Sequence, residues 1–233
     1  MVDMKIKDVA EMLDVSEATV RRWVLRGIIP SYRIRKQYHF SRIEIEDWVM
    51  SHKLGKAVDD ISKHPEKEEG TSIVGGVRHY SFYRAIHKGD VLFDVPGKTK
   101  EEVIRSTMKH VAKTLELDAD VLTDLLLDRE NLMPTALNHG IGVPHTRDFL
   151  LKEHHDVIYV VFPKKPIEYG ALDGIPVHAL FFLFACEDKR HLNLLAKIAH
   201  LSSNPKALSL LKTKPNKDKL LTFIKAWESS AIK

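Results

Sequence analysis

Apolar residues recur at helical spacing near the start of the chain. Ile6, Val9, Ala10 and Leu13 form one stripe and predict a first helix. Ser16 is a favourable N-cap for a second helix, which runs from Glu17 to about Arg26 with Val20, Trp23 and Val24 facing inward. Gly27 and Pro30 end that helix. Two short helices joined by a tight turn form a helix-turn-helix.

The next segment alternates apolar and polar residues and predicts a hairpin. Tyr32, Ile34, Tyr38 and Phe40 flank Lys36 and Gln37, where the chain is expected to turn. Ser41 can then cap a third helix that carries Ile43, Ile45, Trp48 and Val49. Residues 1–52 are therefore predicted to form a small winged helix-turn-helix domain.

Residues 53–78 lack a clear apolar period. They mix acidic and basic residues with Pro65, Gly70, Gly75 and Gly76, a composition that cannot bury enough surface to order itself. We interpret this segment as a charged flexible linker. It shows no sustained heptad pattern, so a dimerising coiled coil is not expected here.

From residue 79 to residue 233 helical and strand patterns alternate. Strands are expected at 91–95, 141–145, 157–162 and 177–185, and helices at 80–86, 99–115, 121–129, 189–202, 204–212 and 216–229. The runs at 157–162 and 177–185 are almost wholly apolar, as in central strands covered on both faces. The prediction is an α/β fold, with a mixed β-sheet sandwiched between helices.

Composition adds little to this picture. The chain is 44% hydrophobic and 29% charged with a net charge of +4, which is ordinary for globular proteins. The single cysteine, Cys186, excludes an internal disulfide and suits a reducing compartment. No apolar run is long enough to span a membrane, and the N-terminus lacks a signal-peptide core. A cytoplasmic location without membrane attachment is expected.

The distribution of charge is more informative. From Arg21 to Arg42 the chain has seven Lys or Arg residues and no Asp or Glu. A basic second helix followed by a basic hairpin is typical of contact with the phosphates of duplex DNA. The alternative is a solvated basic face on a protein-interaction module.

The N-terminal domain resembles the winged-helix domains of the excisionase and MerR type. The matching residues are 6–13, 15–23, 27–30 and 38–42, which include the stretches IKDVAEML and VSEATVRRW. The resemblance implies that the second helix enters the major groove and that the hairpin is the wing. It assigns DNA contacts to Thr19, Arg21 and Arg22 in the helix and to Arg33, Arg35 and Lys36 in the wing. The family commonly has a glycine at the wing tip, and this chain has none.

The stretch from Gly140 to His145 carries the candidate chemistry. Glycine lets neighbouring groups approach closely, and Pro144 fixes its own φ and keeps Val143 extended. The imidazole of His145 would thus be held at the end of a short strand, with Arg147 two residues later. This arrangement can present a nucleophile to an anion. Taken alone, it fits better a buried strand that happens to end in histidine.

The order of motifs in residues 79–233 resembles the IIA domain of the fructose–mannitol class of the bacterial phosphotransferase system, including its nitrogen-regulatory relatives. The matching segments are 94–103, 127–135, 140–145 and 191–195. The resemblance implies that His145 accepts a phosphoryl group from a phosphohistidine carrier protein and passes it to a IIB-type acceptor or a regulatory target. It also assigns Arg129 and His191 to the site. The chain departs from the family at Ala136, Asn138 and His139.

These residue types suit phosphoryl transfer. A neutral imidazole is a competent nucleophile near neutral pH, and a guanidinium can bind two phosphate oxygens. The first turn of a helix, where His191 is expected, also favours anions. No cofactor and no metal ion is required, and no cluster of Cys or His has convincing metal-ligand spacing.

Two hypotheses follow. In the first, the chain is a regulatory phosphoryl carrier with a DNA-binding domain, and hence a component of a phosphotransferase. In the second, it is a transcriptional regulator whose IIA-like domain only binds a partner or ligand. A hydrolase that uses His145 as a base is a weaker third reading, because no paired carboxylate accompanies it. The sequence also leaves open whether phosphorylation of His145 changes how the chain binds DNA or whether the two domains act independently of each other. The sequence leaves open a homodimer.

Overall fold

The computed structural model describes residues 4–35, 37–50, 80–146, 148, 151 and 155–230. Residues 4–50 form the helix-turn-helix domain, and residues 80–230 form what we call the sheet domain. The linker predicted at 53–78 lies outside the described residues. In the described part of the chain no helix has the length and apolar character needed to cross a membrane.

The helix-turn-helix domain follows the sequence prediction closely. Helices α1 (Ile6–Leu13), α2 (Glu17–Leu25) and α3 (Arg42–Met50) surround a small apolar core. The Ser16 hydroxyl accepts a hydrogen bond from the Thr19 amide (3.1 Å), which confirms the predicted N-cap of α2. Trp23 and Trp48 pack with ring centroids 5.5 Å apart, and the Trp48 indole donates to the Ile28 carbonyl (2.7 Å).

The wing is a hairpin of β2 (Tyr32–Ile34) and β3 (Gln37–Phe40). A strand that was not predicted, β1 (Met4–Lys5), pairs with β3 and completes a sheet of order β1-β3-β2. Arg35 adopts a left-handed backbone, with φ at 45°, where the family commonly has glycine. The wing therefore forms without a glycine, at the cost of a strained arginine. Lys36 lies outside the described residues.

The sheet domain contains a five-stranded mixed sheet of order β4-β7-β8-β6-β5. Its strands are β4 (Val91–Val95), β5 (Ala136–Leu137), β6 (Ile141–Gly142), β7 (Val157–Pro163) and β8 (Ala179–Phe184). β4 is parallel to β7 and β6 to β8, whereas the other pairs are antiparallel. The apolar runs that form β7 and β8 are central and buried, as predicted. Strand β5 was not predicted.

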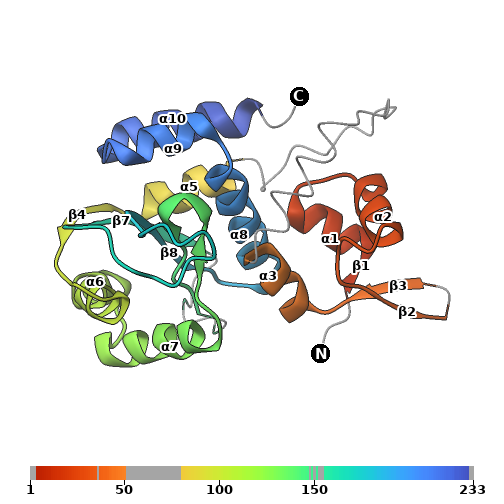
Figure 1. Cartoon of the computed structure of the whole chain (residues 1–233), viewed down its shortest axis with the longest axis horizontal. Coiled ribbons are helices and arrows are strands. Elements are labelled where there is room, and N and C mark those ends of the chain that lie inside the picture. Colours follow the sequence, from red (N-terminus) through yellow and green to blue (C-terminus); the bar gives the residue numbers. More distant parts are fainter. Residues whose placement is uncertain are drawn as a thin grey trace.

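Helices cover both faces of this sheet (Figure 1). On one face α6 (Lys100–Leu115) and α7 (Ala119–Leu132) pack on Tyr159 and Val161 of β7. On the other, α5 (Ser81–Lys88) and α8 (Asp188–Ser202) pack on Ile158 and Val160. Helices α9 (Pro205–Lys212) and α10 (Lys217–Ser230) lie outside α5 and α8. The alternation along β7 is the period of two expected of a strand, and the predicted fold class is confirmed.

A buried ion pair ties α5, α8 and α10 together. The Lys197 ammonium lies 2.7 Å from a carboxylate oxygen of Glu228 and donates to the Ser81 hydroxyl (2.9 Å). The same carboxylate accepts the amide hydrogens of Phe82 and Tyr83 (3.2 and 2.9 Å). Glu228 thus satisfies amides in the first turn of α5 that no preceding residue of the helix can bond.

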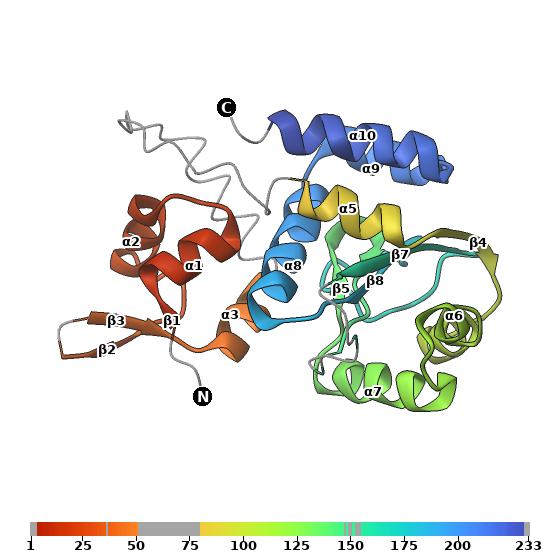
Figure 2. The same cartoon turned by 180° about the vertical axis from the view of Figure 1, so that it is seen from behind.

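The helix-turn-helix domain packs directly on the sheet domain through α8. Helix α8 is buried on almost every side, because the sheet lies against one side and α1 and α3 against the other (Figures 1 and 2). Apolar residues of both domains belong to one continuous core. The Asn193 amide of α8 donates to the Met12 carbonyl of α1 (3.2 Å), in a buried hydrogen bond across the boundary. The two domains are therefore in direct contact in the structure.

Candidate functional site

The segment that carries His145 is anchored at several points. Gly140 has φ at 76°, and a side chain there would place its Cβ 2.8 Å from the Pro176 carbonyl oxygen. The Val143 amide donates to the Thr135 carbonyl (2.8 Å), and the Leu183 amide donates to the Pro144 carbonyl (3.0 Å). Regular strand structure ends at Gly142, earlier than predicted, but His145 still forms a parallel bridge with Leu183 of β8. The imidazole is held on stiff backbone.

The hydrogen bonds of His145 determine which ring nitrogen can react. Nδ1 lies 2.7 Å from the Val143 carbonyl oxygen. Because a carbonyl oxygen only accepts, Nδ1 must carry the proton of this hydrogen bond. In the neutral ring the lone pair is then on Nε2. The nitrogen able to attack an electrophile is therefore Nε2, on the side of the ring away from Val143.

The structure brings together the three residues that the family resemblance assigned to the site. We call Arg129, His145 and His191 the acceptor cluster. Arg129 lies near the end of α7, where its Nη1 donates to the Met133 carbonyl (3.2 Å), and His191 lies near the start of α8. The imidazole centroids of His145 and His191 are 5.2 Å apart. All three side chains are buried, with at most 3% of each residue exposed.

A fourth side chain enters the acceptor cluster from the other domain. Glu46 of α3 is fully buried, and its Oε1 lies 3.1 Å from Nε of Arg129 and 3.3 Å from Nε2 of His145. Its Oε2 lies 3.9 Å from Nε2 of His191. Asp47 adds a looser contact, with Oδ1 3.6 Å from Nη2 of Arg129. The carboxylate of Glu46 thus faces every member of the cluster.

Glu46 was missed in the sequence, although a signal was present. It lies between the buried residues Ile45, Trp48 and Val49 of α3, on a helix side where the pattern calls for apolar residues. A carboxylate in that position requires a cationic or hydrogen-bonding partner. The sequence alone could have shown that a glutamate is unusual at this position of α3. It could not have named partners as distant in the chain as Arg129 and His145.

The electrostatics show which groups are charged. Burial alone would raise the pKa of the Glu46 carboxyl. The hydrogen bond and charge of His145, together with the charges of the other neighbours, outweigh burial and hold that pKa well below its ordinary value. Burial and the adjacent His145 hold the pKa of His191 well below its ordinary value. At neutral pH the site therefore contains a Glu46 carboxylate and a neutral His191.

The neighbouring Glu130 has a structural role. Its carboxylate accepts the Thr135 amide (2.7 Å), the Thr135 hydroxyl (2.6 Å) and the Tyr169 hydroxyl (3.2 Å). Burial raises the pKa of Glu130 above its ordinary value, although the hydrogen bonds from Thr135 oppose the rise. These bonds fix the turn between α7 and β5, and with it the positions of Arg129 and of the backbone that supports Val143.

The same groups could in principle bind a cation. Glu46, His145 and His191 each offer a ligand atom, and these atoms lie within 4.8 Å of one another. However, the Arg129 guanidinium already lies 3.1 Å from the carboxylate and would repel a metal ion. We therefore describe the acceptor cluster as a site for an anion, which Glu46 supplies in this structure.

The departures from the family pattern lie beside the site. Ala136 is buried in β5, whereas His139 is exposed on the turn before β6. His139 has φ at 65°, and its amide donates to the Asp173 carboxylate (2.6 Å). The additional histidine at position 139 therefore lies on this exposed turn.

The residues assigned to DNA differ in exposure. Arg21, Arg33 and Arg35 are exposed, and Arg22 is half-buried. Thr19 is buried, and its hydroxyl accepts from Ser16 in the N-cap of α2, so it does not form part of an open surface. Figure 2 shows the β2–β3 hairpin projecting away from the sheet domain. Helix α2 and the wing are therefore not the surfaces that meet α8.

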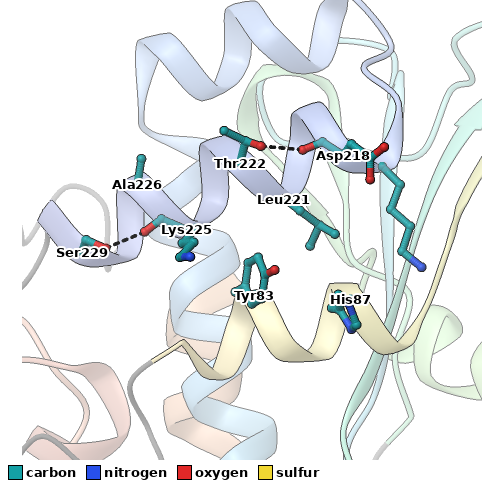
Figure 3. A pocket seen from close by; sticks show the side chains of 9 residues that line it. Tyr83, His87, Asp218, Leu221, Thr222, Lys225, Ala226 and Ser229 are labelled. Atoms are coloured by element: carbon teal, nitrogen blue, oxygen red, sulfur yellow. Dashed lines mark hydrogen bonds between the residues drawn. The ribbon is translucent and has the colours of Figure 1, made fainter.

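A groove away from this site lies between α5 and α10 (Figure 3). It encloses about 820 Å³ and is lined by residues such as Tyr83, His87 and Leu221. Two of its hydroxyls are bonded within their own helix, that of Thr222 to the Asp218 carbonyl and that of Ser229 to the Lys225 carbonyl (each 2.8 Å). The groove contains no residue of the acceptor cluster, and we assign no function to it.

Comparison with known proteins identifies the family of each part. Residues 84–227 match the family described as "Phosphoenolpyruvate-dependent sugar phosphotransferase system, EIIA 2", and residues 4–53 match the family described as "Helix-turn-helix domain". The first match covers more than half of the chain. The chain therefore belongs to the EIIA 2 family and carries a helix-turn-helix domain at its N-terminus.

Individual relatives agree with this assignment. A nitrogen regulatory protein of Pseudomonas aeruginosa is 32% identical over 139 residues, which is 58% of this chain and 89% of that protein. The fructose-specific EIIABC component of Bacillus subtilis is 25% identical over 140 residues, 59% of this chain but 22% of that protein. The solved structure of the nitrogen regulatory protein IIA-Ntr from Neisseria meningitidis superposes with a TM-score of 0.55 at 22% identity, covering 61% of this chain and 97% of that one. The last likeness concerns the fold of the sheet domain.

Proposed function

We propose that this chain is a regulatory phosphoryl carrier of a phosphoenolpyruvate-dependent phosphotransferase system. In this proposal a phosphohistidine carrier protein donates a phosphoryl group to Nε2 of His145. The observation that carries the proposal is the orientation of His145. Its Nδ1 is bonded to the Val143 carbonyl, and its Nε2 faces a site that already holds an anion beside Arg129 and His191.

The transfer step needs only groups that the two proteins supply. The lone pair of Nε2 forms a bond to phosphorus while the bond from phosphorus to the donor's imidazole nitrogen breaks. The donor nitrogen keeps that bonding electron pair, and the Nδ1 proton of His145 stays in its hydrogen bond to Val143. Phosphoryl transfer has a loose transition state, so the protein acts mainly by positioning groups and by balancing charge.

The other members of the acceptor cluster would balance that charge. Arg129 has a planar fork that can bind two phosphoryl oxygens, and Nη1 is already oriented by the Met133 carbonyl. His191 lies near the N-terminal end of α8, where the helix dipole favours an anion. We propose that both position the phosphoryl group and that the second acceptor is a IIB-type protein or a regulatory target.

The helix-turn-helix domain supports a regulatory function with DNA as the second partner. The exposed arginines Arg21, Arg33 and Arg35 lie on α2 and on the wing, the two elements that such domains apply to duplex DNA. The similarity to nitrogen regulatory proteins supports regulation over sugar uptake. We propose that the domain binds duplex DNA through these two elements.

A second candidate function has one observation in its favour. His145 is fully buried and already in contact with Glu46, an arrangement that also suits a sheet domain that binds its own helix-turn-helix domain and transfers nothing. In that case the chain is a transcriptional regulator whose IIA domain acts only as a binding module.

Incubation with phosphoenolpyruvate, enzyme I and the phosphocarrier protein, followed by mass spectrometry, separates the two functions. We expect one phosphoryl group per chain, labile in acid, and no label on His145→Ala. Arg129→Ala and His191→Ala should slow labelling without abolishing it, because neither is the acceptor. If the carrier protein is labelled while the native chain and the Glu46→Ala variant both stay unlabelled, phosphoryl transfer to this chain is excluded. Label that persists on His145→Ala would move the acceptor elsewhere.

A further inference from the structure

The contact between the domains places a carboxylate where the proposed reaction needs a phosphoryl group. Glu46 is the residue of the helix-turn-helix domain that faces all three members of the acceptor cluster. Its Oε1 lies 3.3 Å from Nε2 of His145, the nitrogen that would form the bond to phosphorus. A carboxylate and a phosphoryl group are both oxygen-bearing anions, and both suit a guanidinium with two imidazoles beside it.

We infer that Glu46 is a built-in occupant of the phosphoryl site, so that docking of the helix-turn-helix domain and phosphorylation of His145 exclude each other. This inference rests on the proposed function. It adds an intramolecular partner and a form of regulation that phosphoryl transfer by itself does not require. The unphosphorylated chain is docked, as in the structure, and the phosphorylated chain is released.

The exclusion has a steric and an electrostatic cause. Phosphorus bonded to Nε2, with its three oxygens, would take up the space that the Glu46 carboxylate fills. A phosphoryl group also brings about 1.5 to 2 negative charges, which would lie against a buried carboxylate. In addition, the 3.3 Å contact between Nε2 of His145 and Oε1 of Glu46 is a hydrogen bond only while Nε2 carries a proton. A protonated Nε2 has no lone pair with which to attack phosphorus.

Release of Glu46 would involve the whole domain. The residue lies within α3 among Ile45, Trp48 and Val49, which are buried in the domain core, so the helix cannot turn Glu46 outward without disrupting that packing. Two further polar links across the boundary are partly exposed, and water can replace them when the domains separate. Arg42 pairs with Asp188 (2.9 Å), and Asp8 pairs with Lys189 (3.4 Å).

Docking leaves the proposed DNA surface open. Helix α2 and the wing point away from α8, whereas α1 and α3 make the contact (Figure 2). Phosphorylation would therefore free the position and orientation of the helix-turn-helix domain, while α2 and the wing stay accessible in both states. Such a change alters how two domains, or two chains, can reach paired DNA sites.

The first test compares rates of phosphorylation in the intact chain. Glu46→Ala removes the occupant, and Glu44→Ala is its matched control, because Glu44 is exposed on the same helix. We expect Glu46→Ala to be labelled on His145 about tenfold faster than the native chain or more, since labelling is limited by the fraction of chains with an open site. Glu46→Gln, which keeps the side-chain volume and removes the charge, should fall between the two. Glu44→Ala should match the native rate.

The outcomes separate this inference from the proposed function. If the native chain, Glu44→Ala and Glu46→Ala are all labelled on His145 at equal rates, the chain is a phosphoryl carrier but Glu46 does not occupy its site. If none is labelled while the carrier protein itself is, both the function and the inference fail.

The second test measures docking directly and does not depend on a variant. A zero-length carbodiimide reagent joins a carboxylate to an amine in contact with it, as Asp8 and Lys189 are across the domain boundary. The control lies within the sheet domain, where Asp94 contacts Lys214 (3.0 Å). Phosphorylation should remove most of the Asp8–Lys189 cross-link and leave the Asp94–Lys214 cross-link unchanged. An Asp8–Lys189 yield that is the same in both states would overturn the exclusion.

Discussion

The ion pair between Glu46 and Arg129 allows a quantitative prediction about stability. Both side chains are almost fully buried, and the nearest nitrogen and oxygen are 3.1 Å apart. Two unit charges about 4 Å apart attract by about 4 kcal/mol at an effective dielectric constant of about 20. Removal of one partner from a buried pair typically costs about 3–5 kcal/mol, because the other charge stays buried without compensation. We therefore expect Arg129→Ala to lower the free energy of unfolding by about 3 kcal/mol or more.

The size of the coupling distinguishes this ion pair from ordinary packing. When Glu46 is already alanine, Arg129→Ala removes its hydrogen bond to Met133, its looser contact with Asp47 and some packing, which together cost about 1–2 kcal/mol. A double-mutant cycle should thus give a coupling of about 1–3 kcal/mol.

Denaturant unfolding followed by tryptophan fluorescence is a suitable assay, because Trp23 and Trp48 report on the helix-turn-helix domain. The shared apolar core leads us to expect that both domains unfold together in the native chain. A coupling between Glu46 and Arg129 below about 0.5 kcal/mol, within the range found for independent sites, would refute the reasoning.

Three further predictions concern other parts of the chain. The double variant Arg21→Ala with Arg33→Ala should bind duplex DNA more weakly. Its slope of log affinity against log salt should flatten by about one unit for each phosphate that the variant no longer neutralises. An affinity that does not depend on salt concentration would contradict DNA binding. The pKa of His191 is depressed, so below about pH 6.5 the unfolded chain binds a proton that the folded chain does not. Acid titration from about pH 7 to 5.5 should therefore lower the unfolding free energy by up to about 1.4 kcal/mol per pH unit. An unaltered slope in His191→Gln would be inconsistent with this cause. Gly140→Ala should lower the unfolding free energy by about 1–3 kcal/mol, because the added Cβ would meet the Pro176 carbonyl. Gly174→Ala, with a similar φ but open space around it, should lower the unfolding free energy less. Equal destabilisation of the two variants in thermal unfolding would refute the role of that close approach.

Local patterns predicted most of the fold. The cap at Ser16, the helix stripe of Ile6–Leu13 and the apolar runs that became β7 and β8 depend on neighbouring residues, so the sequence alone places them well. Strands β1 and β5 escaped prediction because each has two residues and exists only through pairing with another strand. The strand expected over 141–145 ends early because its regular pairing with β8 stops at Gly142.

The site was less accessible to prediction. The family resemblance pointed to Arg129, His145 and His191, and the structure places them together, but neither periodicity nor composition indicates that Glu46 joins them. Burial of a carboxylate becomes favourable only when the fold supplies its partners from two other helices and a strand end. Thr19 shows the opposite case. The resemblance to related motifs assigned it to DNA, whereas its hydroxyl is used inside the N-cap of α2.

Helix α8 has a consequence for how such a chain can be assembled from parts. Its residues must fit the sheet on one side and α1 and α3 on the other, and Asn193 bonds to α1 while Lys197 bonds to α10. A different helix-turn-helix domain grafted onto this sheet domain would meet a surface shaped for Met12 and Glu46. The two domains are therefore not interchangeable modules, and substitutions on one side of α8 should be matched by substitutions in α1 and α3.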